Sequence, residues 1–343
     1  MFNKTIKPVI LLTILLIIPL SFSKVKDRPL KRKGILGTLA LEPKEGDLIL
    51  SNPKDAGTDY YGNIYLLDAA NQRIIKFDRE FNLIWKIGSK GEGPGEFTFN
   101  PYMFNPGYLT VSDSGRIYVF CTKGKRIQIF DRDGKYLSEF RVPWIIDRMD
   151  LDSKGNLYLS TKTRTSKELI YVFSPEGKYL YSFDNRLIEI PENYYFNDTY
   201  FSIDRKNDEI YTIFRPWPIL RKYRKDGTLI WEKRLDLKKI SKRMKKIVSK
   251  WPVYDLKFLQ NNKRPENDLI YAQFINIDYY NNRLYLFHWW NAVLELDKEG
   301  NVLNCYYNPD FDEFKNFWNI RIINGDIFYF TEEEDVVWIY SIK

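Results

Sequence analysis

Apolar and polar residues alternate in short runs along most of this chain, and residues that favour turns separate the runs. Between residues 111 and 140, three runs rich in Ile, Tyr, Val and Phe are separated by Ser-Asp-Ser-Gly at 112–115 and Asp-Arg-Asp-Gly at 131–134. Glycine adopts positive φ without strain and aspartate accepts nearby backbone N–H groups, so both tetrapeptides are turn signals. Alternation with a period of two indicates pleated strands, and the stretch therefore predicts most of one antiparallel sheet.

The same pattern occurs six times. Each copy has a turn followed by Ile or Leu and then an aromatic residue, and in five copies a second turn follows 18 to 22 residues later. The six copies have their first turns at Gly62, Gly115, Gly155, Asp208, Asn282 and Gly325. The last copy provides three strands and ends with the run 336–342. We expect residues 35–41 to pair beside that run as its fourth strand, because an uncovered sheet edge invites aggregation.

The first residues have the features of a secretory signal peptide. Two lysines precede the apolar run Val9–Leu20, and a small-x-small triplet follows at 21–23. Twelve apolar-dominated residues are short for a membrane span, which needs roughly 20. We therefore expect cleavage of residues 1–23 and export to the periplasm or beyond, with retention as an uncleaved anchor as the alternative. Residues 24–33 are polar and basic and are expected to form a flexible leader.

The segment Asn63–Ile74, together with the Gly-Glu-Gly-Pro-Gly-Glu-Phe run at 91–97, resembles an NHL repeat. The chain is similar in particular to exported bacterial six-bladed β-propeller proteins. This resemblance implies an all-β fold in which residues 34–343 form a ring of six four-stranded antiparallel blades, the last blade closed by the N-terminal strand. Repeats four to six lack the Asp-x-x-Asn-x-Arg segment of the first. Members of such families serve varied binding roles, and a few relatives are enzymes, so the fold alone does not define the function.

Two insertions interrupt the repeats. Residues 186–200 are rich in Tyr and are expected to cap the ring between the third and fourth blades. Residues 238–251 contain seven Lys or Arg and are predicted to form an inserted amphipathic helix. Its apolar face consists of Ile240, Met244, Ile247, Val248 and Trp251. The basic face is either solvated on a helix that shields the ring, or a docking site for anionic lipid head groups, polysaccharide or an acidic partner.

Planar side chains are frequent in the loops that are expected to form one rim of the ring. In a propeller the loops between the second and third strands share a rim with the crossovers between blades. Arg and Trp dominate interface hot spots, and tryptophans also stack on sugars. The candidate ligand-binding residues on this rim are Arg126, Arg164, Arg215, Trp217, His288, Trp289 and Trp290. The alternative for each tryptophan is that it packs adjacent blades together.

Catalytic signals are sparse. His288 is the only histidine, which excludes a zinc site built on several histidines, and the chain has no Gly-x-Ser-x-Gly motif. The glycine-rich residues 88–97 lack the Gly-Lys-Ser/Thr ending of a phosphate-binding loop and predict a crossover between blades. A calcium centre needs several oxygen ligands. Asp147, Asn197, Asp198 and Asn319 are candidates because each is expected near the start of an innermost strand.

These observations favour an exported, noncatalytic binding propeller that recognises a protein or glycan partner through its loop rim and central channel, and that acts as a monomer. One alternative is a calcium-dependent hydrolase or lactonase that acts at the channel, with calcium as its cofactor. Another is a binder of polyanions or of an anionic membrane surface through residues 238–251. The chain carries a formal charge of +8, but export separates it from nucleic acids, which are therefore not expected as partners.

Overall fold

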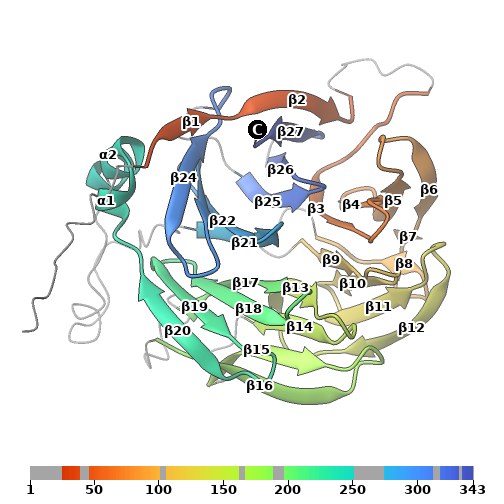
Figure 1. Cartoon of the computed structure of the whole chain (residues 1–343). Coiled ribbons are helices and arrows are strands. Elements are labelled where there is room, and N and C mark those ends of the chain that lie inside the picture. Colours follow the sequence, from red (N-terminus) through yellow and green to blue (C-terminus); the bar gives the residue numbers. More distant parts are fainter. Residues whose placement is uncertain are drawn as a thin grey trace, which may run out of the picture.

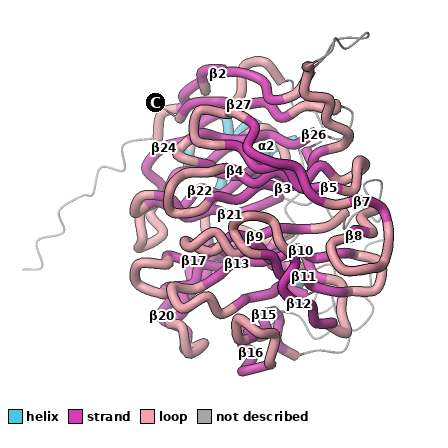
Figure 2. Tube along the Cα trace, turned by 90° about the vertical axis from the view of Figure 1, so that its right-hand side faces the viewer, coloured by secondary structure: helices cyan, strands magenta, loops and turns pink. Residues whose placement is uncertain are grey.

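Six β-sheets are arranged as blades around a central channel (Figure 1). The structure is a computed structural model, and it describes residues 25–38, 46–100, 106–161, 167–187, 197–250, 274–311, 317–331 and 334–342. Nearly all of its regular elements are strands (Figure 2). The prediction of an all-β, six-bladed propeller is confirmed.

Each of the first four blades is a continuous four-stranded antiparallel sheet whose first strand is innermost. Blade one contains β3 (Pro53–Thr58), β4 (Ile64–Asp68), β5 (Arg73–Phe77) and β6 (Leu83–Ile87). Blade two contains β9 (Tyr108–Val111), β10 (Ile117–Cys121), β11 (Arg126–Phe130) and β12 (Tyr136–Arg141). Blade three contains β13 (Ile146–Leu151), β14 (Leu157–Thr161), β15 (Glu168–Phe173) and β16 (Tyr179–Asn185). Blade four contains β17 (Thr199–Asp204), β18 (Glu209–Phe214), β19 (Ile219–Tyr223) and β20 (Leu229–Arg234).

The last two blades are completed by the N-terminal part of the chain. Blade five contains β21 (Phe274–Tyr280), β22 (Arg283–His288), β23 (Ala292–Leu296) and β24 (Val302–Tyr307), and β1 (Asp27–Pro29) adds a fifth strand parallel to β24. Blade six contains β25 (Phe317–Ile323), β26 (Asp326–Thr331) and β27 (Val337–Ser341), and β2 (Lys31–Leu36) pairs antiparallel with β27.

The predicted closure of the last blade is therefore confirmed, with different bounds. The closing strand begins at Lys31 and ends at Leu36, whereas the sequence pattern placed it at 35–41. Residues 24–33 were expected to be a flexible leader, but 27–29 and 31–33 lie in strands. A basic sequence is compatible with an edge strand because its side chains remain in water, and charged side chains protect such an edge from further pairing. The expected signal peptide, residues 1–23, lies outside the described residues.

The repeated sequence pattern explains the blades. In the turn before β12, the Asp131 carboxylate accepts the backbone N–H groups of Asp133 and Lys135, both at 2.9 Å, and Gly134 has a φ of +84°. The repeated tyrosine of the second strand is buried and connects neighbouring blades. The Tyr158 hydroxyl, for example, donates to the carbonyl of Lys225 in the next blade. Each blade thus packs against the next through the same position of its repeat.

The inserted helix is present but is divided in two. α1 (Leu237–Ile240) and α2 (Lys242–Lys250) are separated by Ser241, which has an extended backbone and whose hydroxyl accepts the N–H of Met244. Ile240, Met244, Ile247 and Val248 are buried against blades four and five, as predicted. Trp251 lies outside the described residues. Within the described chain, no helix has the length and apolar character needed to cross a membrane.

Candidate functional site: the central channel and its two mouths

The first strands of the six blades line the central channel (Figure 1). All six run in the same direction, so their N-terminal ends meet at one mouth and their C-terminal ends meet at the other. The loop mouth is lined by residues that include Lys54, Tyr108, Asp147, Arg215, Trp289 and Asn319. The turn mouth is lined by residues that include Thr58, Thr110, Ser202, Lys206, Tyr280 and Asn324.

A belt of buried aspartates joins the inner strands at the level between the two mouths. Each aspartate lies on an odd-numbered blade and accepts a backbone N–H from the inner strand of the next blade. The pairs are Asp55 with Leu109 at 3.1 Å, Asp150 with Ile203 at 3.1 Å, and Asp278 with Ile322 at 2.7 Å. These bonds satisfy buried polar groups on both partners and hold neighbouring blades at a fixed separation.

Arginines neutralise the belt. The Asp278 carboxylate receives Arg148 at 2.5 Å and Arg321 at 3.2 Å, and Arg321 also reaches Asp55 at 2.7 Å. Burial opposes the charge on Arg321, but Asp278 and Asp55 outweigh this effect and raise the pKa of its guanidinium. The Arg321 guanidinium therefore remains charged. The ion pairs of Arg148 and Arg321 connect Asp278 with Asp55 and join blades three, five, six and one on the inner side of the ring.

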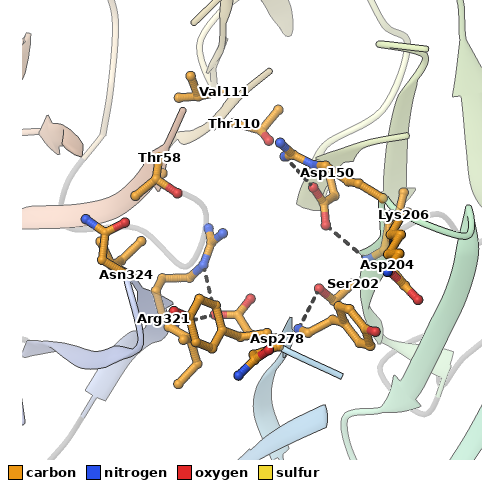
Figure 3. Close-up of a pocket in the computed structure, with 18 of the residues that line it drawn as sticks. Thr58, Thr110, Val111, Asp150, Ser202, Asp204, Lys206, Asp278, Arg321 and Asn324 are labelled. Carbon is orange, nitrogen blue, oxygen red and sulfur yellow. Dashed lines mark hydrogen bonds and ion pairs between the residues drawn. The ribbon is translucent and has the colours of Figure 1, made fainter. Parts of the chain in front are cut away.

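The turn mouth opens above this belt as a polar cavity of about 450 Å³. Figure 3 shows Thr58, Asp150, Ser202, Asp278 and Arg321 around an open space. The carboxylates on its floor are paired, so its accessible groups are hydroxyls, amides, one lysine and aromatic faces. A concave site with a few fixed polar groups is typical of ligand binding.

Two exposed side chains give the turn mouth its outer edge. Tyr280 is 38% exposed and its hydroxyl lies over the Gly325 turn of blade six, at 3.1 Å from the position that a Cβ would occupy there. Lys206 belongs to the part of the lining contributed by blade four, is exposed and forms no ion pair with a described residue. Arg205 of blade four bridges Asp150 of blade three at 3.1 Å and Asp113 of blade two at 2.9 Å. This bridge fixes the loop that carries Lys206.

The loop mouth is smaller, with a cavity of about 50 Å³ among the described residues. Four of the predicted residues line it: Arg215, Trp289, Asp147 and Asn319. Arg215 lies 3.6 Å from the Asp198 carboxylate. Burial opposes the charge of Arg215, but Tyr200, Asp198 and Asp147 together raise the pKa of its guanidinium. The structure thus places these four residues in the lining of the loop mouth.

Three other predicted rim residues are buried. Trp217 and Trp290 are 2% and 8% exposed, and His288 is 2% exposed at the end of β22. His288 packs edge-on against Phe274 with ring centroids 5.5 Å apart. These residues were expected at the rim because they follow second strands in the repeat. The structure assigns them to packing between strands, and they are not accessible ligand contacts.

Arg126 also has a structural role. It is 3% exposed and donates to the backbone carbonyls of Glu92 and Glu96 in the glycine-rich segment, and to the Glu139 carboxylate at 3.1 Å. This segment connects β6 to blade two through a short parallel pair, β7 (Ser89–Lys90) with β8 (Glu96–Phe97), as expected for a crossover. Arg164, the remaining predicted ligand contact, lies outside the described residues.

The proposed calcium ligands do not form one site. Asp147 and Asn319 line the loop mouth, whereas the Asn197 side chain accepts the N–H of Leu187 at 2.8 Å. Asn319 donates to Asp55 at 3.0 Å and accepts from Asn276 at 3.0 Å, and Asp198 is paired with Arg215. No group of three or more His, Cys, Asp or Glu suited to a metal occurs in the described part of the chain. A guanidinium between carboxylates supplies the charge that a cation would bring, so these residues do not fit a calcium centre.

Comparisons with known proteins agree with this architecture. Residues 58–169 match a protein family described as a 6-bladed beta-propeller. NHL repeat-containing protein 3 of Homo sapiens is 33% identical to the chain over 150 residues, which are 43% of this chain and 35% of the human protein. The chain thus spans about a third of the length of this curated relative. The resemblance to NHL-repeat propellers is confirmed.

Similar solved structures include proteins of different kinds. A member of the DUF4221 family from Bacteroides vulgatus has a TM-score of 0.58 at 12% identity, covering 93% of this chain and 98% of that protein. A gluconolactonase from Xanthomonas campestris has a TM-score of 0.52 at 11% identity, covering 93% and 96%. Identities this low show the shared fold and leave the activity open.

Proposed function

We propose that the protein is an exported, noncatalytic binding propeller that takes a protein or glycan partner at the turn mouth. The observation that carries this proposal is the open polar cavity of about 450 Å³ above a belt whose charges are already paired. Paired, buried charges give a rigid floor, and exposed hydroxyl, amide and tyrosine groups can contact a polar partner. The signal-like N-terminal sequence supports export.

This proposal places the partner at the turn mouth, whereas the sequence pattern placed it at the loop rim. The sequence pattern favoured the loop rim, but four of its seven candidates are buried or engaged in packing. The lactonase alternative lacks a suitable set of calcium ligands among the described residues.

The test compares two double variants. Tyr280→Ala with Lys206→Glu alters the edge of the turn mouth, and Tyr179→Ala with Lys178→Glu makes the same changes on exposed positions of blade three. Binding to a glycan array and to immobilised envelope proteins identifies the partner class, and titration against the strongest ligand gives the affinity. We expect the mouth variant to lose at least about tenfold in affinity, or roughly 1.4 kcal/mol, as for an interface tyrosine.

The control variant should bind like the wild type, and both variants should melt at the wild-type temperature. Equal affinity of the mouth variant and the control would exclude the turn mouth as the site. Stoichiometric calcium in the purified protein, measured by elemental analysis, would favour the enzyme alternative.

A further inference from the structure

Positive charge is concentrated in two short segments of the chain. Residues 24–33 carry a formal charge of +5 and residues 237–250 carry +7, while the whole chain carries +8. All other residues together therefore carry −4. The basic character of the protein is a property of these two segments, and a concentrated charge of one sign attracts surfaces of the opposite sign.

The part of the first segment that contains β1 lies beside α1 and α2 on the outside of the ring (Figure 1). Val25 packs against the cluster that contains Leu237 and Met244, and the backbone N–H of Arg243 donates to the Asp27 carboxylate at 3.0 Å. The pairing of β1 with β24 fixes this arrangement. We call the resulting surface the basic flank, and its members include Lys26, Arg28, Lys31, Lys238, Lys242 and Lys245.

The charge of the basic flank is accessible. These six side chains are exposed, and none forms an ion pair with a residue that the structure describes. Neighbouring cations are neutralised, since Lys33 pairs with Asp326 at 2.5 Å and Lys239 with Asp236 at 3.0 Å. The apolar face of α2 is covered by the blades, so the helix presents only its basic face outward. Such a surface can adsorb to anionic head groups without inserting into the bilayer.

We propose that the basic flank docks on a membrane surface rich in anionic phospholipid. This proposal takes the form of the chain in which the apolar run Val9–Leu20 is retained as an anchor, and in that form only residues 21–25 separate the run from Lys26, the first residue of the basic flank. Five extended residues span at most about 18 Å. A bilayer that holds the apolar run therefore lies within reach of the basic flank. A free anionic polysaccharide would match the charge of the basic flank, but the apolar run would not hold it close to the flank.

The test uses the full chain and two triple variants in vesicle flotation. The flank variant removes three positive charges from the basic flank through Lys242→Gln, Lys245→Gln and Lys246→Gln. The control variant removes the same number of charges from exposed positions of other blades through Lys86→Gln, Lys154→Gln and Lys178→Gln. Neutral phosphatidylcholine vesicles measure binding through the apolar run alone. Vesicles that contain phosphatidylglycerol add the contribution of the flank. We expect the flank variant to bind these anionic vesicles about a hundredfold more weakly than the wild type.

The control variant should keep the wild-type preference for anionic vesicles, and added salt should abolish that preference. Equal partitioning of the wild type into neutral and anionic vesicles would overturn the proposal, as would an unchanged preference in the flank variant. Tight binding to heparin without any preference for phosphatidylglycerol would assign the basic flank to a polysaccharide and would equally overturn it. These outcomes are independent of the turn mouth, whose residues are unchanged in both variants.

Discussion

Burial determines the chemistry of His288. Its Nδ1 accepts the backbone N–H of Trp290 at 3.2 Å, and burial lowers the pKa of the imidazole to about 3. The folded state therefore keeps this side chain neutral, whereas in the unfolded chain it has an ordinary pKa of about 6.5. Below that pH the unfolded state binds more protons than the folded state. Stability is thus fully present above about pH 6.5 and is lost as the pH falls towards 3.

We expect the free energy of unfolding to fall by about 2 kcal/mol between about pH 6.5 and pH 5, at roughly 1.4 kcal/mol per unit. His288→Asn retains an acceptor for the Trp290 N–H and should flatten this dependence. Because the chain has no other histidine, the difference between the two slopes isolates one group. Urea denaturation at several pH values in this window measures both. Parallel slopes for the two proteins would show that His288 becomes protonated in the folded state.

The sequence pattern predicted that His288 and the arginines lie in loops at one rim of the ring. It did not predict which residues surround them. Arg126 follows a second strand, like any rim residue, yet its partners are carbonyls of the glycine-rich segment more than 25 residues earlier. Asp55 and Asp278 carry no local signal of the belt, because the guanidinium groups they bind and the N–H groups of Leu109 and Ile322 come from other blades. A local pattern predicts strands and turns; it does not predict which distant groups meet in the channel.

Among the elements, β2 shows the limit of local prediction most clearly. Its alternation was recognised, but its basic first half has the composition of a solvated leader, and its partner β27 lies about 300 residues away. The turns at Gly115 and Gly134 were predicted correctly because a glycine with positive φ and a short loop are local features. The division of the inserted helix at Ser241 was missed, since the apolar spacing continues across it.

Neighbouring residues of β2 provide a matched test of its role. Leu36 is 8% exposed and packs in the cluster that contains Val337 and Ile339, whereas Ile35 is 37% exposed. We expect Leu36→Ala to reduce the free energy of unfolding by about 2 to 4 kcal/mol, as for a buried leucine in a core. Ile35→Ala, which removes a similar amount of side chain from the same strand, should cost less than about 1 kcal/mol. Chemical denaturation measures both, and equal losses would mean that β2 is not packed on blade six as described.

At the scale of the whole molecule, one short N-terminal segment closes the ring. β1 covers the edge of blade five and β2 covers the edge of blade six, so residues 27–36 join two blades at once. The aspartate belt makes the inner side of the ring similarly continuous. Both features join residues that lie on different blades. The repeat in the sequence describes one blade at a time, so it predicted the number of blades but not the depth or the chemistry of either mouth.

Removal of residues 1–36 should therefore open the ring, whereas removal of residues 1–24 should leave it closed. Without β2, the edge of β27 presents unpaired backbone groups and uncovers the cluster around Val337. We expect the longer truncation to melt at a lower temperature and to self-associate through the open edge. Differential scanning calorimetry and light scattering compare the two truncated proteins.

A peptide of residues 25–38 should restore the longer truncation when it is added in trans, because it can supply both missing strands as separate chains do in strand addition. The same peptide with Leu30→Asp and Leu36→Asp should not, since these side chains are 3% and 8% exposed in the intact chain and would place charge in two apolar clusters. Rescue by the first peptide alone would show that closure depends on side-chain packing as well as backbone pairing. Equal melting temperatures for the two truncations would instead mean that the blades hold together without the N-terminal strands.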